Sequence, residues 1–363
     1  MTENAPPPFS ERMAAILNGG ALTVAVAIGY RTGLFDAMAG MAAPAPASAV
    51  AAAAGLSERY VREWLGIMGT GGVVDMEKDG GGETLFRLPP DRAACLTRDA
   101  GTGNLAVYAQ EIPLLTVTAM EKVVAAFRTG EGVPYRDYPA FQSFMADLSN
   151  AKHRDTLVDT FLPSVEGGLM VRRLRAGIRV CDLGCGEGVA VLLMARSFPE
   201  SRFTGIDLDA GALERAREAA RREGIANAVF EAADAARLSE SPRHRGAFDY
   251  VTAFDAVHDQ TAPLEALRGV RAMLAPGGRF SMVDIAAHSD PVRNAAHPMA
   301  PFLYTVSLLH CMPVGLMDGG AGLGMMWGRE AALELLAAAG FEEVAVAAIP
   351  DDPFNLHFFC KAP

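Results

Sequence analysis

A glycine-rich turn follows an apolar run near the middle of the chain, in the stretch "VCDLGCGEG". Asp182 closes the apolar run, and three glycines follow at alternate positions: Gly184, Gly186 and Gly188. Glycines let the backbone turn tightly and come close to a ligand at the point where a helix begins. A structural strand-to-helix turn without a ligand would use the same residues. The stretch therefore predicts a ligand-binding loop or a purely structural turn.

Two further apolar runs also end in acidic residues. Their spacing favours a ligand-binding loop over a purely structural turn. Asp207 follows the glycine-rich turn at about the 20-residue distance expected of a carboxylate that holds ribose hydroxyls. Asp234 ends the third run, where it could accept a hydrogen bond from an adenine amino group. Leu208 and Ala235 follow these two aspartates and join them as candidate cofactor-binding residues. The set predicts a cofactor that contains a nucleoside.

The spacing of the glycines discriminates between two classes of cofactor. Dinucleotide-binding loops show G-x-G-x-x-G, because a pyrophosphate sits at the N-terminus of the helix. Here the third glycine comes one residue early, and Glu187 precedes it. A carboxylate at this place suits a positively charged ligand such as S-adenosylmethionine (SAM), which carries an ammonium and a sulfonium group. SAM is therefore the expected cofactor, and an NAD-dependent dehydrogenase is the alternative enzyme.

His258 stands in "TAFDAVHDQTAP", where a fourth apolar run ends shortly before a helix expected from Pro263. A neutral imidazole with a pKa near 6.5 can take a proton from a hydroxyl or a thiol. The same histidine could instead line a pocket or hydrogen-bond the backbone of the turn. Asp259 either takes part in catalysis or only lies near the N-terminus of the next helix, where the helix dipole favours it. Asp255 either contacts the cofactor or caps the turn.

Short apolar strands alternate with helices from Ile178 onward, which predicts a parallel sheet with helices on both faces. Strands are expected at "IRVCDLG", "RFTGIDL", "AVFEAAD", "FDYVTAFDAV", "RFSMVDIAA", "EEVAVAAI" and "LHFFCKA". Helices are expected over Val189–Ser197, Ala210–Glu223, Pro263–Leu274 and Arg329–Ala339.

The first part of the chain has a different pattern. Residues 1–12 are expected to form a loose tail, and Met13–Met38 is expected to be helical. Two helices then flank a turn at Gly55–Ser57, and strands at Val73–Glu77 and Thr84–Leu88 would form a hairpin. A helix–turn–helix followed by a hairpin is the pattern of a winged helix.

A winged helix suggests DNA binding, but the charges of this module argue against it. Its second helix carries two charges of each sign, and the hairpin is mostly acidic. DNA binding needs a positive face that neutralises phosphates, and a net charge of −11 disfavours nucleic acid and anionic membranes as partners. We expect a domain for dimerisation or for covering the substrate. A SAM-sensing transcription regulator is the competing interpretation.

The composition narrows the classes of protein to which the chain can belong. The chain has 363 residues, half of them hydrophobic and 21 % charged, as in a soluble globular protein with room for two domains. Apolar runs such as Ala21–Ile28 are shorter than the roughly 20 residues that a bilayer requires, and the start does not resemble a signal peptide. Five scattered cysteines without CxxC indicate a reducing cytoplasm. The histidines form neither HxH nor HxxxH, so no metal site is expected.

Residues from about 171 to 363 resemble the class I SAM-dependent methyltransferases, through "VCDLGCGEG", "LAPGGRF" and "LLAAAGFEEVAV". The resemblance implies a seven-stranded sheet whose last strand inserts antiparallel. It also implies that the aspartate and glycines of the first motif lie along the methionine part of SAM. Asp207 would then hold the ribose and Asp234 the adenine.

The stretch "FDAVHDQ" resembles the H-D-W segment of small-molecule O-methyltransferases of the plant caffeate type and their bacterial relatives. These enzymes carry an N-terminal winged-helix dimerisation domain, and their histidine removes the proton of the acceptor hydroxyl. That role falls on His258, with Asp259 beside it, while Gln260 replaces the tryptophan and leaves the acceptor open. Asp284 stands where related enzymes place an acid that orients the histidine, or it only contacts solvent. A thioether acceptor has no proton to lose, and His258 would then only position it.

The segment between residues 286 and 328 is far longer than an ordinary connection between a strand and a helix. Its aromatic residues, methionines and glycines suit a lid over an apolar acceptor pocket. Alternatively, part of it is a helix that packs on the core. The chain also resembles a bacterial group of such methyltransferases with the pattern "HCMPV…GAGLG.MWG". Candidate acceptor-binding residues are Tyr304, His310, Cys311 and Trp327, with Tyr135 and Tyr138 from an upstream loop.

Together these features predict an α/β fold, with a seven-stranded Rossmann-like methyltransferase domain over residues 173–363. A winged-helix dimerisation domain over 13–95 and a helical, substrate-covering region over 96–172 would precede it. The expected protein is a cytoplasmic homodimer that transfers a methyl group from SAM to a hydroxyl or sulfur (thiol or thioether) of a small metabolite.

Overall fold

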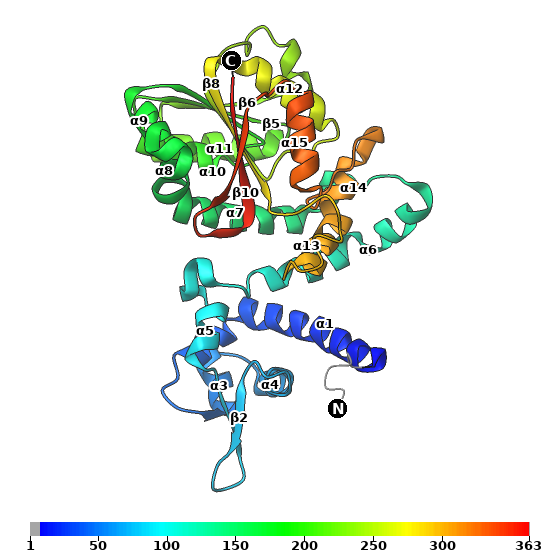
Figure 1. Cartoon of the computed structure of the whole chain (residues 1–363). Coiled ribbons are helices and arrows are strands. Elements are labelled where there is room, and N and C mark those ends of the chain that lie inside the picture. Colours follow the sequence, from blue (N-terminus) through cyan, green and yellow to red (C-terminus); the bar gives the residue numbers. More distant parts are fainter. Residues whose placement is uncertain (1–7, 363) are drawn as a thin grey trace, which may run out of the picture. The chain divides into compact units, whose positions relative to one another are not determined.

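The computed structural model describes residues 8–362, and its contacts divide the chain into two compact units between Leu114 and Leu115. In the N-terminal unit, α3 and α4 form the predicted helix pair, and β2 and β3 form the predicted hairpin (Figure 1). The short strand β1 pairs with β3, so the sheet order is β1-β3-β2. The elements are α1 (Phe9–Thr32), α2 (Leu34–Ala39), β1 (Ala45–Pro46), α3 (Ala47–Ala54), α4 (Glu58–Thr70), β2 (Asp75–Lys78), β3 (Thr84–Arg87), α5 (Pro90–Leu96), and the 3-10 turns η1 (Arg98–Gly103) and η2 (Tyr108–Gln110).

Two expectations about the first helix were wrong. Helix α1 begins at Phe9, so it includes the end of the expected tail; residues 1–7 lie outside the described part of the chain. The helix expected to reach Met38 ends at Thr32, because Gly33 adopts a left-handed conformation with φ 74°. Its N–H group then caps the last turn, as glycine commonly does at a helix end. A new helix, α2, starts at Leu34.

Trp64 of α4 forms the centre of the N-terminal core. Its indole N–H donates to the carbonyl of Ala25 at 2.8 Å, and its ring meets Phe35 edge to face. A Cβ atom on Gly29 would lie 2.5 Å from the Trp64 ring, so only glycine lets α1 approach so closely. The same contacts leave a large part of α1 outside this core.

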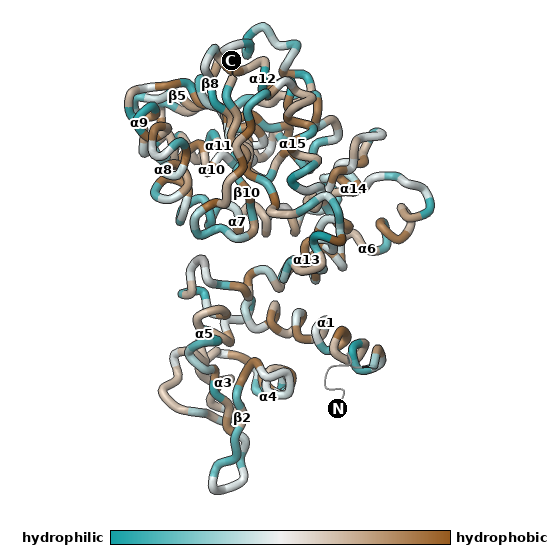
Figure 2. The backbone as a smooth tube through the Cα atoms, viewed as in Figure 1, coloured by the Kyte–Doolittle hydropathy of each residue, from teal (hydrophilic) through white to brown (hydrophobic). Residues whose placement is uncertain are grey.

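Helix α1 exposes an unusual amount of apolar surface, and Figure 2 shows its apolar turns behind a polar beginning. The exposed large side chains are Phe9, Met13, Ile16, Leu17, Val24 and Ile28. Among the described residues, α1 is the one helix whose length and composition would allow it to cross a membrane, with 17 % of its apolar window buried. A helix from a soluble core or a signal sequence passes the same test. The sequence suggested only shorter apolar runs. The mean hydropathy over the helix stays high although Asn18, Gly19 and Gly20 interrupt those runs.

The C-terminal unit begins with a run of helices that precedes the sheet in the chain. Tyr138 and Phe141, at the start of α7, are completely buried within this unit. The region expected to cover the substrate is therefore part of the same compact unit from Leu115 onward, and residues 96–114 fall in the other unit. The elements are α6 (Glu111–Thr129), η3 (Tyr135–Asp137), α7 (Pro139–Thr156), η4 (Leu157–Phe161), α8 (Leu162–Ser164), η5 (Val165–Gly168) and α9 (Leu169–Ala176).

A seven-stranded sheet follows in the order β6-β5-β4-β7-β8-β10-β9. Strands β6, β5, β4, β7 and β8 pair in parallel, and β10 pairs antiparallel with both β8 and β9. The predicted antiparallel insertion of the last strand is confirmed. The strands are β4 (Arg179–Leu183), β5 (Arg202–Asp207), β6 (Ala228–Ala232), β7 (Phe248–Phe254), β8 (Leu274–Ile285), β9 (Val344–Ile349) and β10 (Asp352–Lys361).

Helices cover both faces of this sheet, as alternating strands and helices require (Figure 1). On one face, α9, α10 and α11 pack against Val180, Phe203 and Tyr250. On the other face, α12 and α15 pack against Val251, Phe280 and Met282. The helices are α10 (Val189–Ser197), α11 (Ala210–Glu223), η6 (Ala235–Glu240), α12 (Pro263–Met273) and α15 (Gly328–Ala338).

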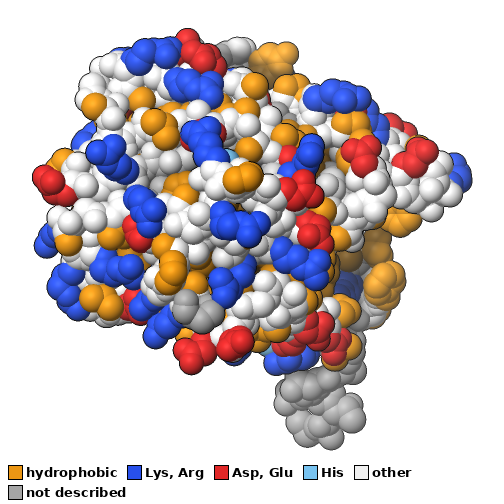
Figure 3. Space-filling view, turned by 90° about the horizontal axis from the view of Figure 1, so that it is seen from above, with side chains coloured by type: hydrophobic (Ala, Val, Ile, Leu, Met, Phe, Trp, Pro, Cys, Tyr) orange, Lys and Arg blue, Asp and Glu red, His pale blue; other side chains and the backbone are white. Residues whose placement is uncertain are grey.

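The long segment between β8 and α15 is largely helical. It contains α13 (Ala300–Val306), the π-helical turn η7 (Ser307–Cys311), α14 (Met312–Gly315) and η8 (Met317–Gly319). The upstream loop is tied to it, because the N–H of Val133 donates to the carbonyl of Pro313 at 3.0 Å. On the face seen in Figure 3, lysines and arginines lie scattered among acidic and uncharged side chains and form no continuous stripe.

Candidate active site

The glycine-rich loop connects the carboxyl end of β4 to α10. Gly184, Gly186 and Gly188 have φ values of 73°, 52° and 72°, in the left-handed region that favours glycine. A Cβ atom on Gly184 would lie 2.6 Å from the Cβ atom of Ala256, and one on Gly188 would lie 2.4 Å from the Phe230 ring. The loop thus lies directly against the loop that follows β7. The predicted cofactor loop and the predicted catalytic loop are neighbours.

Asp182 lies beneath this loop and is almost completely buried. The Thr252 hydroxyl donates to its carboxylate at 2.6 Å. Burial raises the pKa of Asp182 to about 7, and the neighbouring charge of Asp207 acts in the same direction. The surroundings therefore disfavour a negative charge on Asp182.

Asp207 at the end of β5 holds the glycine-rich loop in place. Its Oδ2 atom accepts from the N–H of Gly186 at 2.8 Å, and its Oδ1 atom accepts from the N–H of Asp209 at 2.8 Å. A carboxylate has about four acceptor positions, so it can still bind ribose hydroxyls. The next residue, Leu208, is 75 % exposed, which is unusual for a leucine beside a buried strand. This exposed face suits a ligand that packs on it.

Asp234 and Ala235 lie at the start of η6. The Asp234 side chain caps this turn by accepting from the N–H of Ala236 at 2.9 Å, and Ala235 is buried. The Glu187 carboxylate pairs with the Arg215 guanidinium at 2.8 Å, on a largely exposed surface. The sequence argument treated Glu187 as a free negative charge. Arg215 compensates that charge, so the glycine spacing and Asp207 are the stronger evidence about the cofactor.

His258 is buried and is oriented by Asp284. Its Nδ1 atom lies 2.7 Å from Oδ1 of Asp284, and since a carboxylate accepts, Nδ1 carries the proton. The same Oδ1 atom also accepts from the indole N–H of Trp327 at 3.1 Å and from the N–H of Ile285 at 2.9 Å. These donors fix the carboxylate, and the carboxylate fixes the imidazole. The position of Asp284 beside the histidine agrees with the arrangement that the resemblance implied.

The other ring nitrogen of His258 faces Asp259 and Cys311. Its Nε2 atom lies 3.5 Å from Oδ1 of Asp259. Burial opposes a charge on the imidazole, but Asp284 and Asp259 outweigh it, and the pKa of His258 is raised well above its usual value. Burial also raises the pKa of the Cys311 thiol, to about 12. These surroundings therefore favour the protonated imidazole and the neutral thiol.

Asp255 is the strained residue at the end of β7. Its φ is 49°, rare for a residue with a side chain, and Asn355 donates to its Oδ2 atom at 3.3 Å. Its Oδ1 atom is buried without a hydrogen-bond partner, and burial raises its pKa to about 6. Backbone strain of this kind clusters at functional sites. Both interpretations of Asp255 remain compatible with this geometry.

The predicted acceptor residues divide into two groups. His310 is buried among three rings, at 4.8 Å from Tyr138, 4.7 Å from Phe141 and 5.9 Å from Tyr135. The Tyr138 hydroxyl donates to the carbonyl of Leu309 at 2.8 Å. His310 and Cys311 lie in the π-helical turn η7, a feature frequent at functional sites. The upstream loop and the long segment thus form one structure, and Cys311 from it reaches His258.

Trp327 and Tyr304 lie elsewhere. Trp327 is buried in the core under α12 and α15, and its indole serves Asp284. Its contacts support the His258–Asp284 pair, and its expected contact with the acceptor stays a prediction. Tyr304 packs in a separate cluster with Ile285, and its hydroxyl accepts from the Asn294 side chain at 3.0 Å.

A small cavity next to the site, with charged groups in a mostly apolar lining, was not predicted. It has a volume of about 50 Å3 and is lined by Asp255, Lys152, His153, Asp352 and apolar neighbours. Lys152 pairs with Asp352 at 2.6 Å, and loss of solvation lowers the pKa of the half-buried His153 to about 4. The lining comes from α7, η4, β7 and the residue after it, β8, β9 and β10, and the sequence contains no spacing that signals this combination.

Two parts of the chain match known families. Residues 174–302 match the family described as "Methyltransferase domain", and residues 20–98 match the "Rv2258c-like winged HTH domain". Among curated proteins, 27-O-demethylrifamycin SV methyltransferase of Amycolatopsis mediterranei is 34 % identical over 119 residues. The match covers 32 % of this chain and 42 % of that protein. The chain thus matches less than half of the length of this relative.

Solved structures resemble the chain over nearly its full length. A putative O-methyltransferase from Nostoc punctiforme has a TM-score of 0.67 at 19 % identity and covers 99 % of this chain and 100 % of that one. Human N-acetylserotonin methyltransferase in complex with SAM has a TM-score of 0.63 at 17 % identity and covers 100 % and 99 %. At such identities, the likeness establishes the fold.

Proposed function

On the premise that the chain carries a methyltransferase domain of α/β fold behind a winged helix-turn-helix domain, we propose its reaction. It transfers the methyl group of SAM to a hydroxyl or a sulfur atom of a small metabolite. SAM binds along Asp182 and the glycine-rich loop, with its ribose at Asp207 and its adenine between Leu208, Asp234 and Ala235. The acceptor binds on the side of His258, under the long segment that contains His310 and Cys311.

One observation carries this proposal. The glycine-rich loop packs against the loop after β7, so that Gly184 has no room for a side chain beside Ala256. A cofactor held along the first loop therefore lies next to the residues of the second, which include His258. Methyl transfer needs in-line attack on a carbon that the sulfonium already activates, and the enzyme mainly supplies orientation.

The proposed role of His258 is to position the acceptor or to remove its proton. Asp284 holds the ring with Nδ1 protonated, which leaves Nε2 on the acceptor side. The imidazole must be neutral before it can act as a base, and its pKa in the cofactor-free protein is raised. The positive sulfonium of SAM favours loss of that proton, because like charges disfavour each other at short range. A thioether acceptor would need only the positioning role.

Whether an oxygen or a sulfur atom receives the methyl group depends on which acceptor binds. The RlmD proteins among the relatives are named for carbon 5 of a uracil. The Nostoc protein is named as an O-methyltransferase, and the rifamycin enzyme is named for an O-demethylated substrate. The latter two names support a hydroxyl acceptor. The apolar and aromatic surroundings of His310 suit a thiol or a thioether equally well.

A turnover screen tests the proposal. SAM consumption would be measured with phenols, thiols and thioether acids, for the wild type and for His258→Ala. For an acceptor that loses a proton, we expect the variant to lose about 10²- to 10⁴-fold in kcat, with SAM affinity unchanged. A variant that keeps full activity with hydroxyl and thiol acceptors at every pH would exclude the base role.

A SAM-sensing transcription regulator is the second candidate, because the N-terminal unit is a winged helix. Its α4 helix pairs Arg59 with Glu63 and Arg62 with Glu58, so its basic residues are neutralised within the helix. This supports the enzyme over the regulator, since DNA binding needs free positive charge. A gel-shift experiment at physiological salt decides: sequence-selective binding to DNA would overturn our assignment of this domain.

We also propose that the protein is a cytoplasmic homodimer that assembles through its N-terminal half. The exposed apolar side chains of α1 support this, because exposed apolar patches in soluble proteins commonly mark interfaces. Neither nucleic acid nor membrane is part of the proposal.

A further inference from the structure

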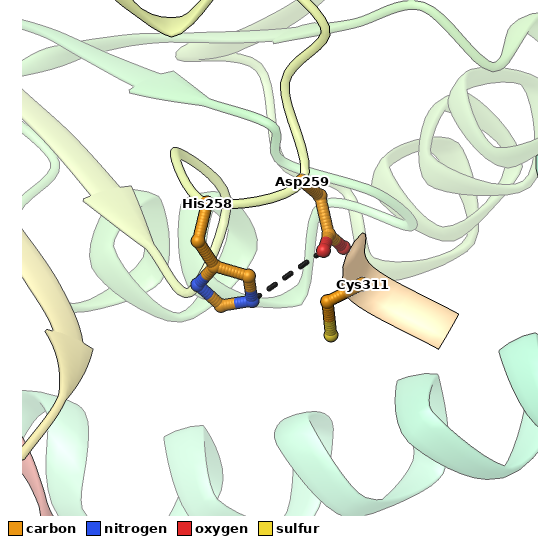
Figure 4. Close-up of side chains that lie close together, drawn as sticks. All are labelled: His258, Asp259 and Cys311. Atoms are coloured by element: carbon orange, nitrogen blue, oxygen red, sulfur yellow. Dashed lines mark ion pairs between the residues drawn. The ribbon is translucent and has the colours of Figure 1, made fainter. Parts of the chain in front are cut away.

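The loop after β7 contributes to two different places. His258 and Asp259 lie together with Cys311 of η7, and one nitrogen, oxygen and sulfur atom from these side chains lie within 4.8 Å of one another (Figure 4). Asp255, at the start of the same loop, instead lines the small cavity between α7, η4 and the edge of the sheet. Of the described residues that line this cavity, none comes from the glycine-rich loop, β5 or η6, where we place SAM.

Asp255 brings a carboxylate oxygen without a partner to this cavity. Its Oδ2 atom accepts from the Nδ2 atom of Asn355 at 3.3 Å, but its Oδ1 atom is buried and accepts from no described group. Asn355 is 3 % exposed, and its own Oδ1 atom is likewise buried without a hydrogen bond. Burying an acceptor without a donor costs free energy. Two neighbouring side chains therefore lack a donor at this place.

The charges around the cavity leave one negative group uncompensated. Among the described lining residues, Lys152 is the one lysine or arginine, and its Nζ atom pairs with Asp352 at 2.6 Å. His153 does not compensate Asp255, because loss of solvation lowers its pKa to about 4 and the imidazole is neutral at pH 7. Burial raises the pKa of Asp255 to about 6. A cation bound beside Asp255 would stabilise its ionised form.

The size and the walls of the cavity suit a small polar group on an apolar stem. Its volume is about 50 Å3. Because one water molecule needs about 10–15 Å3 of such volume, the cavity has room for about three non-hydrogen atoms, such as an ammonium nitrogen and two methylene carbons. Phe254 and Phe161 of the lining meet edge to face at 5.5 Å, and Phe254 meets His153 at 5.0 Å. Aromatic rings pack on methylene groups and attract an ammonium ion.

We propose that this cavity binds a primary ammonium group of the acceptor, so that the acceptor is a hydroxyl or sulfur compound that also carries an amine. An ammonium group offers three donors, which suit the unpartnered oxygens of Asp255 and Asn355. Hydrogen bonds between ionised groups are the strong ones. The inference rests on the proposed function, which places the atom that receives the methyl group beside His258.

The chain limits the length of such an acceptor. Asp255 and His258 are three residues apart, and three residues of extended chain span at most about 10 Å. The proposal therefore favours small acceptors, in which a few atoms separate the amine from the atom that is methylated. Tyramine and cysteamine have this form, with a hydroxyl and a thiol respectively, and they serve as probes.

SAM also carries an ammonium group, at its amino-acid end. Ala256, the neighbour of Asp255, packs against Gly184, so the loop that would hold SAM is close to the cavity. The origin of the described lining in α7, η4 and the strands β7 to β10 favours the acceptor as the source of the ammonium group. The experiment has one arm for each source.

The test uses the full chain, the variant Asp255→Asn and calorimetry. Asparagine keeps the shape of the side chain and tolerates the φ of 49° at this position, so the variant removes the charge without straining the turn. Asp318→Asn is the matched control, because Asp318 has a φ of 55° and an exposed side chain.

The first arm measures the acceptor in the presence of saturating S-adenosylhomocysteine. Tyramine is compared with 4-propylphenol, and cysteamine with 1-propanethiol; in each pair a methyl group replaces the ammonium group. We expect the wild type to bind at least one of the two amines about 10- to 100-fold more tightly than its uncharged counterpart. Asp255→Asn should lose this preference, and Asp318→Asn should keep it. The preference of the wild type is measured without any variant, so the test does not depend on the folding of Asp255→Asn.

The second arm measures SAM and 5′-methylthioadenosine, which lacks the amino-acid end. We expect Asp255→Asn to bind both as the wild type does. If the variant binds SAM more weakly and methylthioadenosine equally well, the ammonium group belongs to SAM and the acceptor assignment is overturned. A wild type without a preference in either acceptor pair also overturns it. Normal SAM binding in that case leaves the proposed function intact, whereas absence of SAM binding to the wild type would contradict the proposed function itself.

Discussion

At the scale of single residues, the site is a chain of oriented groups that ends at His258. Trp327 and Ile285 fix Asp284, and Asp284 fixes His258. The sequence could suggest Asp284 as a partner of His258 only by resemblance to a family. It could not suggest the contact of Trp327 with Asp284, because the direction of a side chain depends on how the elements pack.

Replacing Trp327 by phenylalanine tests this chain of contacts. The variant removes one donor to Asp284 and keeps most of the buried volume, so we expect a loss of about 1 kcal/mol in the free energy of unfolding. If Trp327 only supports the pair, kcat falls and the KM of the acceptor stays the same. A rise in the KM of the acceptor with unchanged kcat would show that Trp327 contacts the acceptor.

The buried carboxyl of Asp182 gives a prediction about pH. Its pKa is raised to about 7 in the folded protein, from 3.8 in the unfolded chain. Between these values the folded state binds more protons, so this residue makes stability decrease as pH rises from about 4 to about 7. Below pH 4 both states are protonated and the effect is constant.

Denaturant unfolding at pH 5 and pH 8 checks this prediction. The Asp182→Asn variant keeps the acceptor for Thr252 and cannot ionise, so it should lose a few kcal/mol less than the wild type between the two pH values. Equal pH dependence in both proteins would show that Asp182 is charged throughout. Comparing variant and wild type cancels the other groups that titrate in this range.

At the scale of elements, the sequence predicted helix bounds well where residues next to the helix end determine them. The helices Val189–Ser197 and Ala210–Glu223 have the predicted bounds, and glycines cap α10 at its beginning and α11 at its end. The bounds of α1 were wrong, because Gly33 acts through a left-handed conformation that the apolar pattern did not reveal. The approach of Cys311 to His258 depends on how the long segment folds, and no local pattern encodes it.

The glycine-rich loop gives a prediction with a matched control. Gly188 and Gly224 both have left-handed φ values, 72° and 68°, but a Cβ atom would meet Phe230 at 2.4 Å only at Gly188. Alanine should cost about 1–2 kcal/mol at either site from backbone strain, and about 1–3 kcal/mol more at Gly188 from overpacking.

Thermal unfolding and SAM calorimetry measure the two effects. Gly188→Ala should lower the melting temperature more than Gly224→Ala and should weaken SAM binding, whereas Gly224→Ala should leave SAM binding unchanged. Equal losses of melting temperature and equal SAM affinities in the two variants would show that the close packing of Gly188 against Phe230 contributes neither to stability nor to SAM binding.

At the scale of the whole molecule, the sequence indicated two kinds of domain, but it placed the boundary elsewhere. The expected substrate-covering region divides between the two units at Leu114, and its larger part folds with the sheet. Such a boundary depends on contacts between distant segments, such as Tyr138 with Leu309. The small cavity beside Asp255 escaped prediction for the same reason.

The proposed homodimer is tested on α1. Leu17 is 69 % exposed, and Leu17→Glu places a charge in the apolar surface. We expect the wild type to elute as a dimer in size-exclusion chromatography with light scattering, and Leu17→Glu to shift it toward monomer. Val292→Glu, at an equally exposed apolar residue of the other unit, is the control and should stay dimeric. A monomeric wild type would contradict the proposal.

The central claim is that the C-terminal unit binds SAM for methyl transfer, and calorimetry with SAM and with NAD(H) tests it most directly. We expect SAM to bind with one site per chain and NAD(H) to give no heat of binding. Asp207→Ala should weaken SAM binding roughly 10- to 100-fold, as loss of hydrogen bonds to a charged group does. Binding of NAD(H) without binding of SAM would contradict the account.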